Sequence, residues 1–180
     1  MELPTKEESL EMLRDSGNPA NIIEHCMKVN DVANYVASML RDSGVDIDLE
    51  VVDRASLLHD VAKYKAIEAN GDVKHGNEGY KILKEAGYPA LGKIIKKHAL
   101  DEILVGGIKT WEEKVVYYAD KRVNGDKVVS LAERFNYLRG KYGKVSMGIL
   151  MLINTCEPAV YRLEREIFKQ IGTNVRLEGI

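Results

Sequence analysis

The chain has 180 residues, 45% of them hydrophobic, and a formal net charge of −2 at pH 7. The length suits one domain of about 100–150 residues with additional helices, and the slight acidity disfavours general binding to the phosphate backbone of nucleic acids. The charged N-terminus does not resemble a signal peptide, the apolar run at 147–153 is too short to span a bilayer, and two cysteines make no disulfide framework. We therefore expect a cytoplasmic protein without a membrane partner.

Helical periodicity runs through the N-terminal half. Thr5 and Glu8 have the spacing of a capping box and predict a helix to about residue 14. Asn18 is expected to cap the next helix, with Pro19 at its first position, and this helix should run to about residue 41. Apolar residues at 51, 55, 58 and 62 predict a third helix that begins near Asp48, and residues 70–72 are expected to form a turn.

The C-terminal half also reads as helical. Helices are expected at about 75–86 and 89–98, a loop at 105–107, and a helix to about residue 122 that opens with the capping box Thr110 and Glu113. The segment 127–171 predicts two or three helices, broken near 140–143 and again at Glu157 and Pro158. Strand-like alternation is weak, so we predict an all-α, compact single-domain helical bundle over residues 1–180.

The four histidines lie on or at the edges of four different expected helices, so any metal site must be assembled by the fold. His25 shares a helix face with an apolar stripe and should point inward. His59 and Asp60 end a buried apolar run, and neighbours on a helix point about 100° apart. The two can therefore reach one ion only near a helix end or in a crevice, whereas Asp60 could reach a second ion.

Asp120 supports the interpretation of these histidines as metal ligands. Taken alone, a buried histidine is usually satisfied by a hydrogen bond, and the same holds for an isolated His-Asp pair. Asp120, however, sits on an expected helix whose apolar residues include Val116, four residues earlier, and a carboxylate that faces the interior needs a positive partner. Imidazole nitrogens with carboxylate oxygens suit Zn, Mn, Fe, Co or Ni.

Together these residues resemble the HD-domain superfamily of metal-dependent phosphohydrolases. The resemblance rests on His25, on LLHDVAK at 57–63 and on Asp120 within YYADKR at 117–122, which follow the pattern H…HD…D. It implies an HD-type fold with a motif core at about 20–125 and C-terminal helices, at about 127–171, packed on it. His75 and His98 resemble the two additional histidines of binuclear members, and the likeness to dinucleoside tetraphosphate hydrolases is loose.

The resemblance also implies a ligand set and an activity. One or two divalent transition-metal ions are expected: a first on His25, His59, Asp60 and Asp120, and a second on His75 and His98, with Asp60 as the bridge. Such a centre predicts hydrolysis of a small phosphoester or phosphoanhydride by metal-activated water. The expected partner is a small phosphorylated metabolite or a nucleotide, and the oligomeric state does not follow from the sequence.

Three residues are the catalytic candidates. Asp60 would bridge the ions, Lys63 follows it on the adjacent helical face, and Arg122 follows Asp120 and could grip a phosphate in two places. Two other functions remain open. An HD-type di-iron oxygenase would use the same residues, because Asp60, His75 and His98 also satisfy the 2-His-1-carboxylate rule. A non-catalytic sensor would keep the metal only to stabilise its fold.

Overall fold

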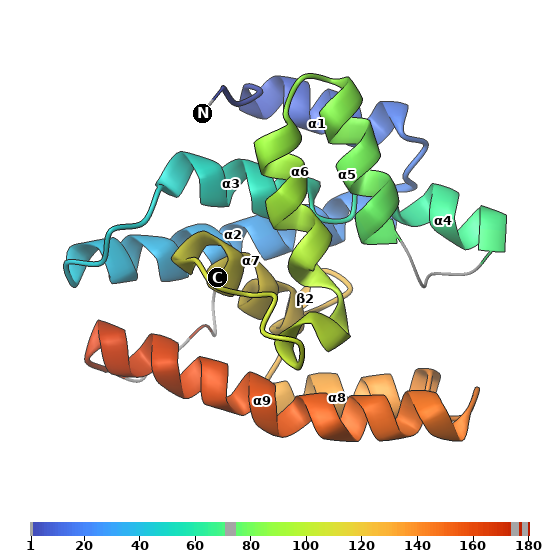
Figure 1. Cartoon of the computed structure of the whole chain (residues 1–180), viewed down its shortest axis with the longest axis vertical. Coiled ribbons are helices and arrows are strands. Elements are labelled where there is room, and N and C mark those ends of the chain that lie inside the picture. Colours follow the sequence, from blue (N-terminus) through green and yellow to red (C-terminus); the bar gives the residue numbers. More distant parts are fainter. Residues whose placement is uncertain (1, 71–74, 174–176, 178–179) are drawn as a thin grey trace.

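The protein is described by a computed structural model over residues 2–70, 75–173, 177 and 180, and its architecture is almost wholly helical (Figure 1). The helices are α1 (Lys6–Asp15), α2 (Ala20–Asp42), α3 (Leu49–Leu58), α4 (Lys63–Asn70), α5 (His75–Glu85), α6 (Pro89–Ile95), the 3-10 helices η2 (Lys96–His98) and η3 (Leu100–Ile103), α7 (Trp111–Lys121), α8 (Leu131–Lys141) and α9 (Met147–Ile171). An antiparallel hairpin of β1 (Val123–Asn124) and β2 (Lys127–Val128) follows α7. The all-α fold class is confirmed, and within the described ranges no helix is long and apolar enough to cross a membrane.

Helix α2 forms the centre of the molecule and packs against α3, α7 and α9. Its buried side chains recur at helical spacing and include Val29, Val32, Val36 and Leu40. Burying an aliphatic side chain of this size contributes about 1.5–3 kcal/mol. One shared core therefore holds together the three helices that carry or precede the predicted ligands His25, His59 and Asp120.

The predicted helix starts are largely confirmed. Capping boxes are present at Thr5 with Glu8 and at Thr110 with Glu113, and the Asp48 side chain caps α3. Glu113 has a second role, because Lys97 Nζ lies 2.6 Å from its Oε1. This ion pair fixes the segment just before His98 against the start of α7.

The connection between α1 and α2 corrects one expectation. Asn18 does not cap α2, which has Pro19 at its N-cap position and no side-chain cap. Instead Asn18 is buried, and its Nδ2 donates to the carbonyl oxygens of Leu13 (3.1 Å) and Val61 (2.8 Å). Its Oδ1 accepts from the backbone N–H of Tyr64 at 3.2 Å. Asn18 thus braces the turn that follows Asp60.

Two helix boundaries also differ from the predictions. The third helix ends at Leu58 rather than continuing to residue 62, and a separate helix begins at Lys63. Helix α9, by contrast, passes through Pro158 without a break. Pro158 has no backbone N–H to donate to the carbonyl oxygen of Asn154. Both residues are exposed, so water can donate to that carbonyl instead. Residues 71–74, in which the expected turn at 70–72 ends, lie outside the described residues.

Helices α8 and α9 form a helical hairpin along one side of the molecule (Figure 1). The C-terminal half of α9 packs on the body, where Tyr118 of α7 donates to Glu164 at 2.8 Å and Lys114 pairs with Glu166 at 2.5 Å. Helix α9 also packs against α8, and Arg139 of α8 pairs with Glu157 of α9 at 2.6 Å. The contacts of Glu164 and Glu166 thus attach the hairpin to the body.

Candidate metal centre

The end of α3 places His59 and Asp60 in the interior. His59 is the C-cap of that helix, and Asp60 lies in the turn that follows. His59 keeps helical backbone angles (φ −57, ψ −34), and the two neighbours lie where the helix ends and the chain turns. Their side chains meet, with His59 Nε2 at 3.5 Å from Asp60 Oδ2, and both residues are buried.

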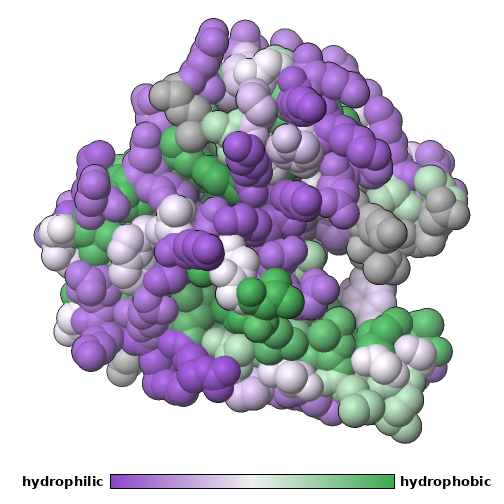
Figure 2. All heavy atoms as spheres, in the orientation of Figure 1, coloured by the Kyte–Doolittle hydropathy of each residue, from purple (hydrophilic) through white to green (hydrophobic). Residues whose placement is uncertain are grey.

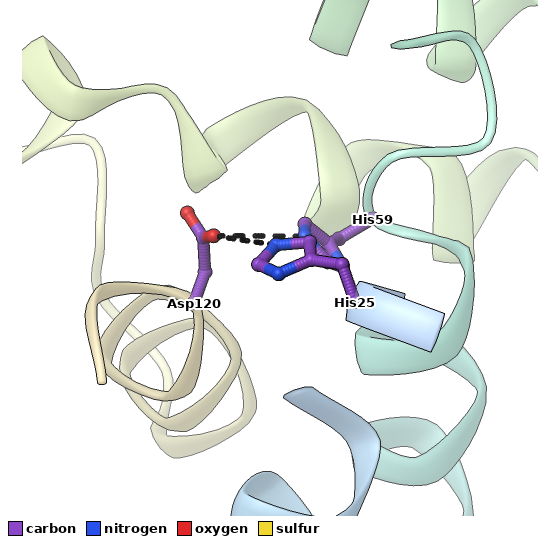
Figure 3. Close-up of side chains that lie close together, drawn as sticks. All are labelled: His25, His59 and Asp120. Carbon is purple, nitrogen blue, oxygen red and sulfur yellow. Dashed lines mark hydrogen bonds and ion pairs between the residues drawn. The ribbon is translucent and has the colours of Figure 1, made fainter. Parts of the chain in front are cut away.

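A first cluster joins His25 of α2, His59 and Asp120 of α7 (Figure 3). Asp120 Oδ1 lies 3.3 Å from His25 Nε2 and 3.7 Å from His59 Nε2. One candidate ligand atom from each residue falls within 4.8 Å of the others. Three segments far apart in the sequence thus direct donors at a common point.

A second cluster joins Asp60, His75 at the start of α5, and His98 in η2. Asp60 Oδ1 lies 3.1 Å from His75 Nε2 and 3.3 Å from His98 Nε2, and the two imidazole Nε2 atoms are 2.5 Å apart. The other oxygen of Asp60 faces the first cluster, at 3.9 Å from His25 Nε2. The Asp60 carboxylate therefore lies between the clusters with one oxygen toward each.

Backbone carbonyls orient three of the imidazoles. The Nδ1 atoms of His25, His59 and His98 lie 2.8, 2.7 and 2.5 Å from the carbonyl oxygens of Gly125, Ser56 and Ile95. A carbonyl can only accept, so each Nδ1 must carry the proton and donate it. A neutral ring then presents an unprotonated Nε2 to the centre, which is the arrangement that metal-ligating histidines use.

The carbonyl that orients His25 comes from a turn that the helical prediction missed. Gly125 lies between β1 and β2 with φ +62, a backbone conformation that favours glycine. The two residues of the hairpin loop are Gly125 and Asp126, and a Gly-Asp pair is a hairpin signal that was available in the sequence. Each strand of the hairpin has only two residues, so the sequence shows no alternation of apolar and polar residues there.

The donor set fits a divalent transition metal. Among the described residues, His59 Nε2 and Asp60 Oδ1 are buried without an assigned hydrogen bond, although the Nε2 atoms of His75 and His98 lie 3.1 and 3.3 Å from Asp60 Oδ1. Leaving such atoms unpaired costs about 1–3 kcal/mol each. Ligands that bind one ion at about 2.0–2.2 Å are themselves about 3–4 Å apart. The contacts between Asp60, Asp120 and the histidines, at 3.1–3.9 Å, match this spacing.

The protonation states of Asp60, Asp120 and His98 also suit a metal. Burial raises the pKa values of Asp60 and Asp120, but the neighbouring cations and imidazoles outweigh burial and hold both well below the usual range. Burial lowers the pKa of His98 to about 4, so its ring is neutral at physiological pH. Burial also lowers the pKa of His25, but the hydrogen bond and charge of Asp120 outweigh this and raise it overall. The adjacent thiol of Cys26 stays protonated, because burial raises its pKa.

Lys121 links the two clusters. Its Nζ contacts Asp120 Oδ2 and donates to the carbonyl oxygen of His98 at 2.9 Å, over the ring of Tyr117. Burial lowers the pKa of Lys121, although Asp120 opposes the shift. This side chain therefore fixes a ligand of the first cluster and the backbone of a ligand of the second.

A cavity of about 380 Å³ opens onto this centre. Among the described residues, Asp60 and Asp120 are the only acidic side chains in its lining. The basic side chains of the lining are Lys63, Lys121, Arg134 and Lys141. The cavity is thus cationic although the whole chain is slightly acidic, and it suits an anionic ligand.

The structure separates the two predicted phosphate contacts. Lys63 lines the cavity, with Nζ 3.6 Å from Asp60 Oδ2. Arg122 is outside the lining: its Nη1 lies 3.1 Å from Glu164 Oε1 and its Nε donates to the Val129 carbonyl oxygen. Because Glu164 of α9 and the Val129 carbonyl hold its guanidinium, the structure does not support the expected contact of Arg122 with phosphate, which stays a prediction. Arg134 of α8, which no motif indicated, lines the cavity instead.

Comparison with known sequences places this centre in a defined class. The sequence model of the HD domain family matches residues 22–125, more than half of the chain, so the chain belongs to that family. The HD domain is the module of a superfamily of metal-dependent phosphohydrolases, and the resemblance noted in the sequence is confirmed.

The chain also has a similar curated relative. An uncharacterized protein of Methanocaldococcus jannaschii is 28% identical over 146 residues, which cover 74% of this chain and 84% of that protein. No solved structure matches the chain.

Proposed function

We propose that the protein is a metal-dependent phosphohydrolase that cleaves a small phosphoester or phosphoanhydride, with a nucleotide as the expected substrate. The observation that carries the proposal is the Asp60 carboxylate, which directs one oxygen to each of two ligand clusters at the edge of a cationic cavity. Membership of the HD domain family supports the reaction class.

Six side chains would hold the metal. His25, His59 and Asp120 would bind one ion, His75 and His98 would bind another, and Asp60 would contribute an oxygen to each. Bound divalent ions supply a water ligand of lowered pKa and Lewis acidity toward phosphoryl oxygens. Asp60 and Asp120 stay ionised because their pKa values are lowered, and they offset part of the metal charge.

Lys63 is the proposed contact for the phosphate. Its ammonium group lies at the cavity surface beside Asp60 and is 23% exposed, so a phosphoryl oxygen can reach it. A charge at this place favours the transition state, in which negative charge builds up on the phosphoryl group. Lys63→Ala should therefore weaken substrate use while the metal content remains unchanged, because Lys63 is no ligand.

The test begins with protein purified without a histidine tag. Its metal content is measured, and Mn- or Fe-loaded protein is then assayed anaerobically against phosphomonoesters, phosphodiesters and phosphoanhydrides, including nucleotides. We expect metal-dependent turnover without oxygen. If fully metallated protein cleaves no member of a broad panel, the proposal is overturned in favour of a sensor. Turnover of an organic substrate that requires oxygen would favour the oxygenase.

A further inference from the structure

The cavity has a wall that lies outside the segment matched by the family. The match ends at residue 125, whereas α8 and the N-terminal half of α9 begin later. Residues of this hairpin that line the cavity are Arg134, Tyr137, Leu138, Lys141, Tyr142, Ile149, Leu152 and Ile153. The cavity is thus lined by ligand residues and by the α8–α9 hairpin, and Figure 1 shows this hairpin along one side of the helices that carry the ligands.

Arg134 brings a guanidinium group to the edge of the metal centre. Its Nη2 lies 3.9 Å from Asp120 Oδ1, and its Nη1 donates to Asn124 Oδ1 at 3.0 Å. Its Nε is buried and has no hydrogen-bond partner among the residues that the structure describes. A charged donor that is buried and unpaired is costly, and a phosphate oxygen is a suitable acceptor for it.

The surface beyond Arg134 is apolar and aromatic apart from Lys141, whose Nζ lies 5.5 Å from the centre of the Tyr137 ring. Tyr137 follows one helical turn later, with its ring 5.7 Å from the guanidinium carbon. Tyr137 is 38% exposed and Leu152 is 36% exposed, although both line the cavity. Figure 2 shows apolar surface along this hairpin, with a gap above its right-hand part. Apolar side chains left open beside a charged centre are typical of a ligand site.

We propose that the α8–α9 hairpin is the substrate-recognition wall of this centre, where Arg134 binds the phosphate and the surface around Tyr137 and Leu152 binds a planar, largely apolar organic group. The inference rests on the proposed function and narrows it. The substrate is then a phosphate ester of an aromatic or nucleoside-like group rather than pyrophosphate or a simple alkyl phosphate. Aromatic side chains bind such groups by stacking, without selecting one base.

Inorganic phosphate is the probe for Arg134, because its binding can be measured without turnover. Titration calorimetry is performed on Mn-loaded wild type, Arg134→Gln and Arg134→Lys. We expect Arg134→Gln to raise the Kd about 10–100-fold, as loss of a charged hydrogen bond does. Arg134→Lys should recover part of the affinity, and the metal content should be equal in all three proteins.

Arg139 provides the matched control on the same helix. It pairs with Glu157 of α9 at 2.6 Å and does not line the cavity. Arg139→Gln should leave phosphate binding unchanged. If Arg139→Gln weakens phosphate binding as much as Arg134→Gln does, the effect is structural and the proposal is lost. It is equally lost if Arg134→Gln binds phosphate like wild type.

The organic group is tested with Tyr137→Ala and Leu152→Ala, and with Met151→Ala as control, because Met151 is exposed on α9 but outside the cavity lining. The first two variants should raise the KM for a nucleoside 5′-monophosphate about tenfold. The kcat, the KM for methyl phosphate and the Kd of inorganic phosphate should not change. An equal rise in the KM for both esters, or no rise for either, would overturn the proposal that the hairpin recognises the organic group.

The two proposals can fail separately. If no phosphoester is turned over, the Kd of the nucleoside monophosphate replaces its KM in the same comparison. If Tyr137→Ala selectively loses binding of the nucleoside monophosphate, recognition by the hairpin is supported even though the proposal of hydrolysis has failed. If turnover is the same in all hairpin variants as in wild type, the proposal of hydrolysis stands and the proposal of recognition by the hairpin is refuted.

Discussion

At the scale of single residues, the centre depends on which atom of each side chain faces inward. His59 and His98 each donate Nδ1–H to the carbonyl three residues earlier, at the end of the preceding helix. Such carbonyls have no partner within the helix, so they are available to histidines placed just after it. The same local geometry, used twice, prepares one ligand for each cluster.

Asp60→Asn should abolish turnover, because a neutral amide no longer bridges two ions or offsets their charge. We expect metal content to fall from two ions per chain to one or fewer. Metal analysis by mass spectrometry and the phosphoester assay measure this. Glu50→Gln removes an exposed carboxylate from the first turn of α3 and should retain the metal. Wild-type turnover by metallated Asp60→Asn would show that the bridge is not needed.

Lys121→Met should weaken metal binding without removing a ligand. The substitution keeps the length of the side chain over Tyr117 but loses the contacts with Asp120 and the His98 carbonyl. Loss of a residue that orients ligands typically costs about 10–100-fold in metal affinity. Competition with a chelator of known affinity gives the Kd. An unchanged Kd would mean that the ligands are oriented by the core alone.

At the scale of elements, a polar network sets the register of α2 against α3. Asn30 and Asn34 of α2 donate to Asp53 Oδ1 of α3 at 3.1 and 2.6 Å. Asp53 also contacts Lys6 and Arg54. Because α2 carries His25 and α3 ends at His59, this network sets the distance between two ligands of the first cluster.

Asp53→Asn should lower the free energy of unfolding by roughly 1–2 kcal/mol at neutral pH, through loss of charged hydrogen bonds. Burial raises the pKa of Asp53, but the amide hydrogen bonds and the two cations outweigh it and lower the pKa from 3.8. The stabilisation is therefore complete above about pH 4 and is lost as the pH falls through the folded-state pKa.

Urea unfolding of both proteins at several pH values measures this difference. The gap between wild type and Asp53→Asn should be constant from about pH 7 to pH 5 and should narrow below about pH 4. A gap that widens on acidification would contradict the lowered pKa of Asp53.

How far the sequence predicts these elements depends on how local the interaction is. The capping boxes at Thr5 and Thr110 involve neighbouring residues and were predicted correctly. The end of α3 at Leu58 was not, because Asn18, distant in sequence, braces the turn that follows. The pattern around His59 and Asp120 indicated a metal centre, whereas Arg134 carries no motif and reaches the cavity only through the packing of α8.

At the scale of the whole molecule, Arg122 and Glu164 attach the C-terminal helix to the body. The ion pair at 3.1 Å is largely buried and is joined by the hydroxyl of Tyr118. Arg122, expected from the sequence to bind phosphate, therefore connects α7 with α9. The wall of the cavity depends on this connection for its position.

Arg122→Gln should consequently act on stability rather than on the reacting groups. Breaking a buried pair leaves Glu164 uncompensated and should lower the free energy of unfolding by about 3–5 kcal/mol, or less where water reaches the carboxylate. Thermal unfolding measures the loss. Below the unfolding transition, the metal content should match wild type. A stable Arg122→Gln protein that binds phosphate poorly would restore the role first expected for Arg122.

The separate origins of ligands and wall have a consequence for divergence among relatives. The proposed metal ligands fall between residues 25 and 120, and the hairpin residues of the cavity between 134 and 153. Apart from Arg134, which contacts Asp120, these hairpin residues can therefore change without disturbing the ligands. A lineage could acquire a new substrate by drift in one surface helix pair while inheriting its chemistry unchanged. Grafting the hairpin of one homologue onto another would then transfer preference between substrates.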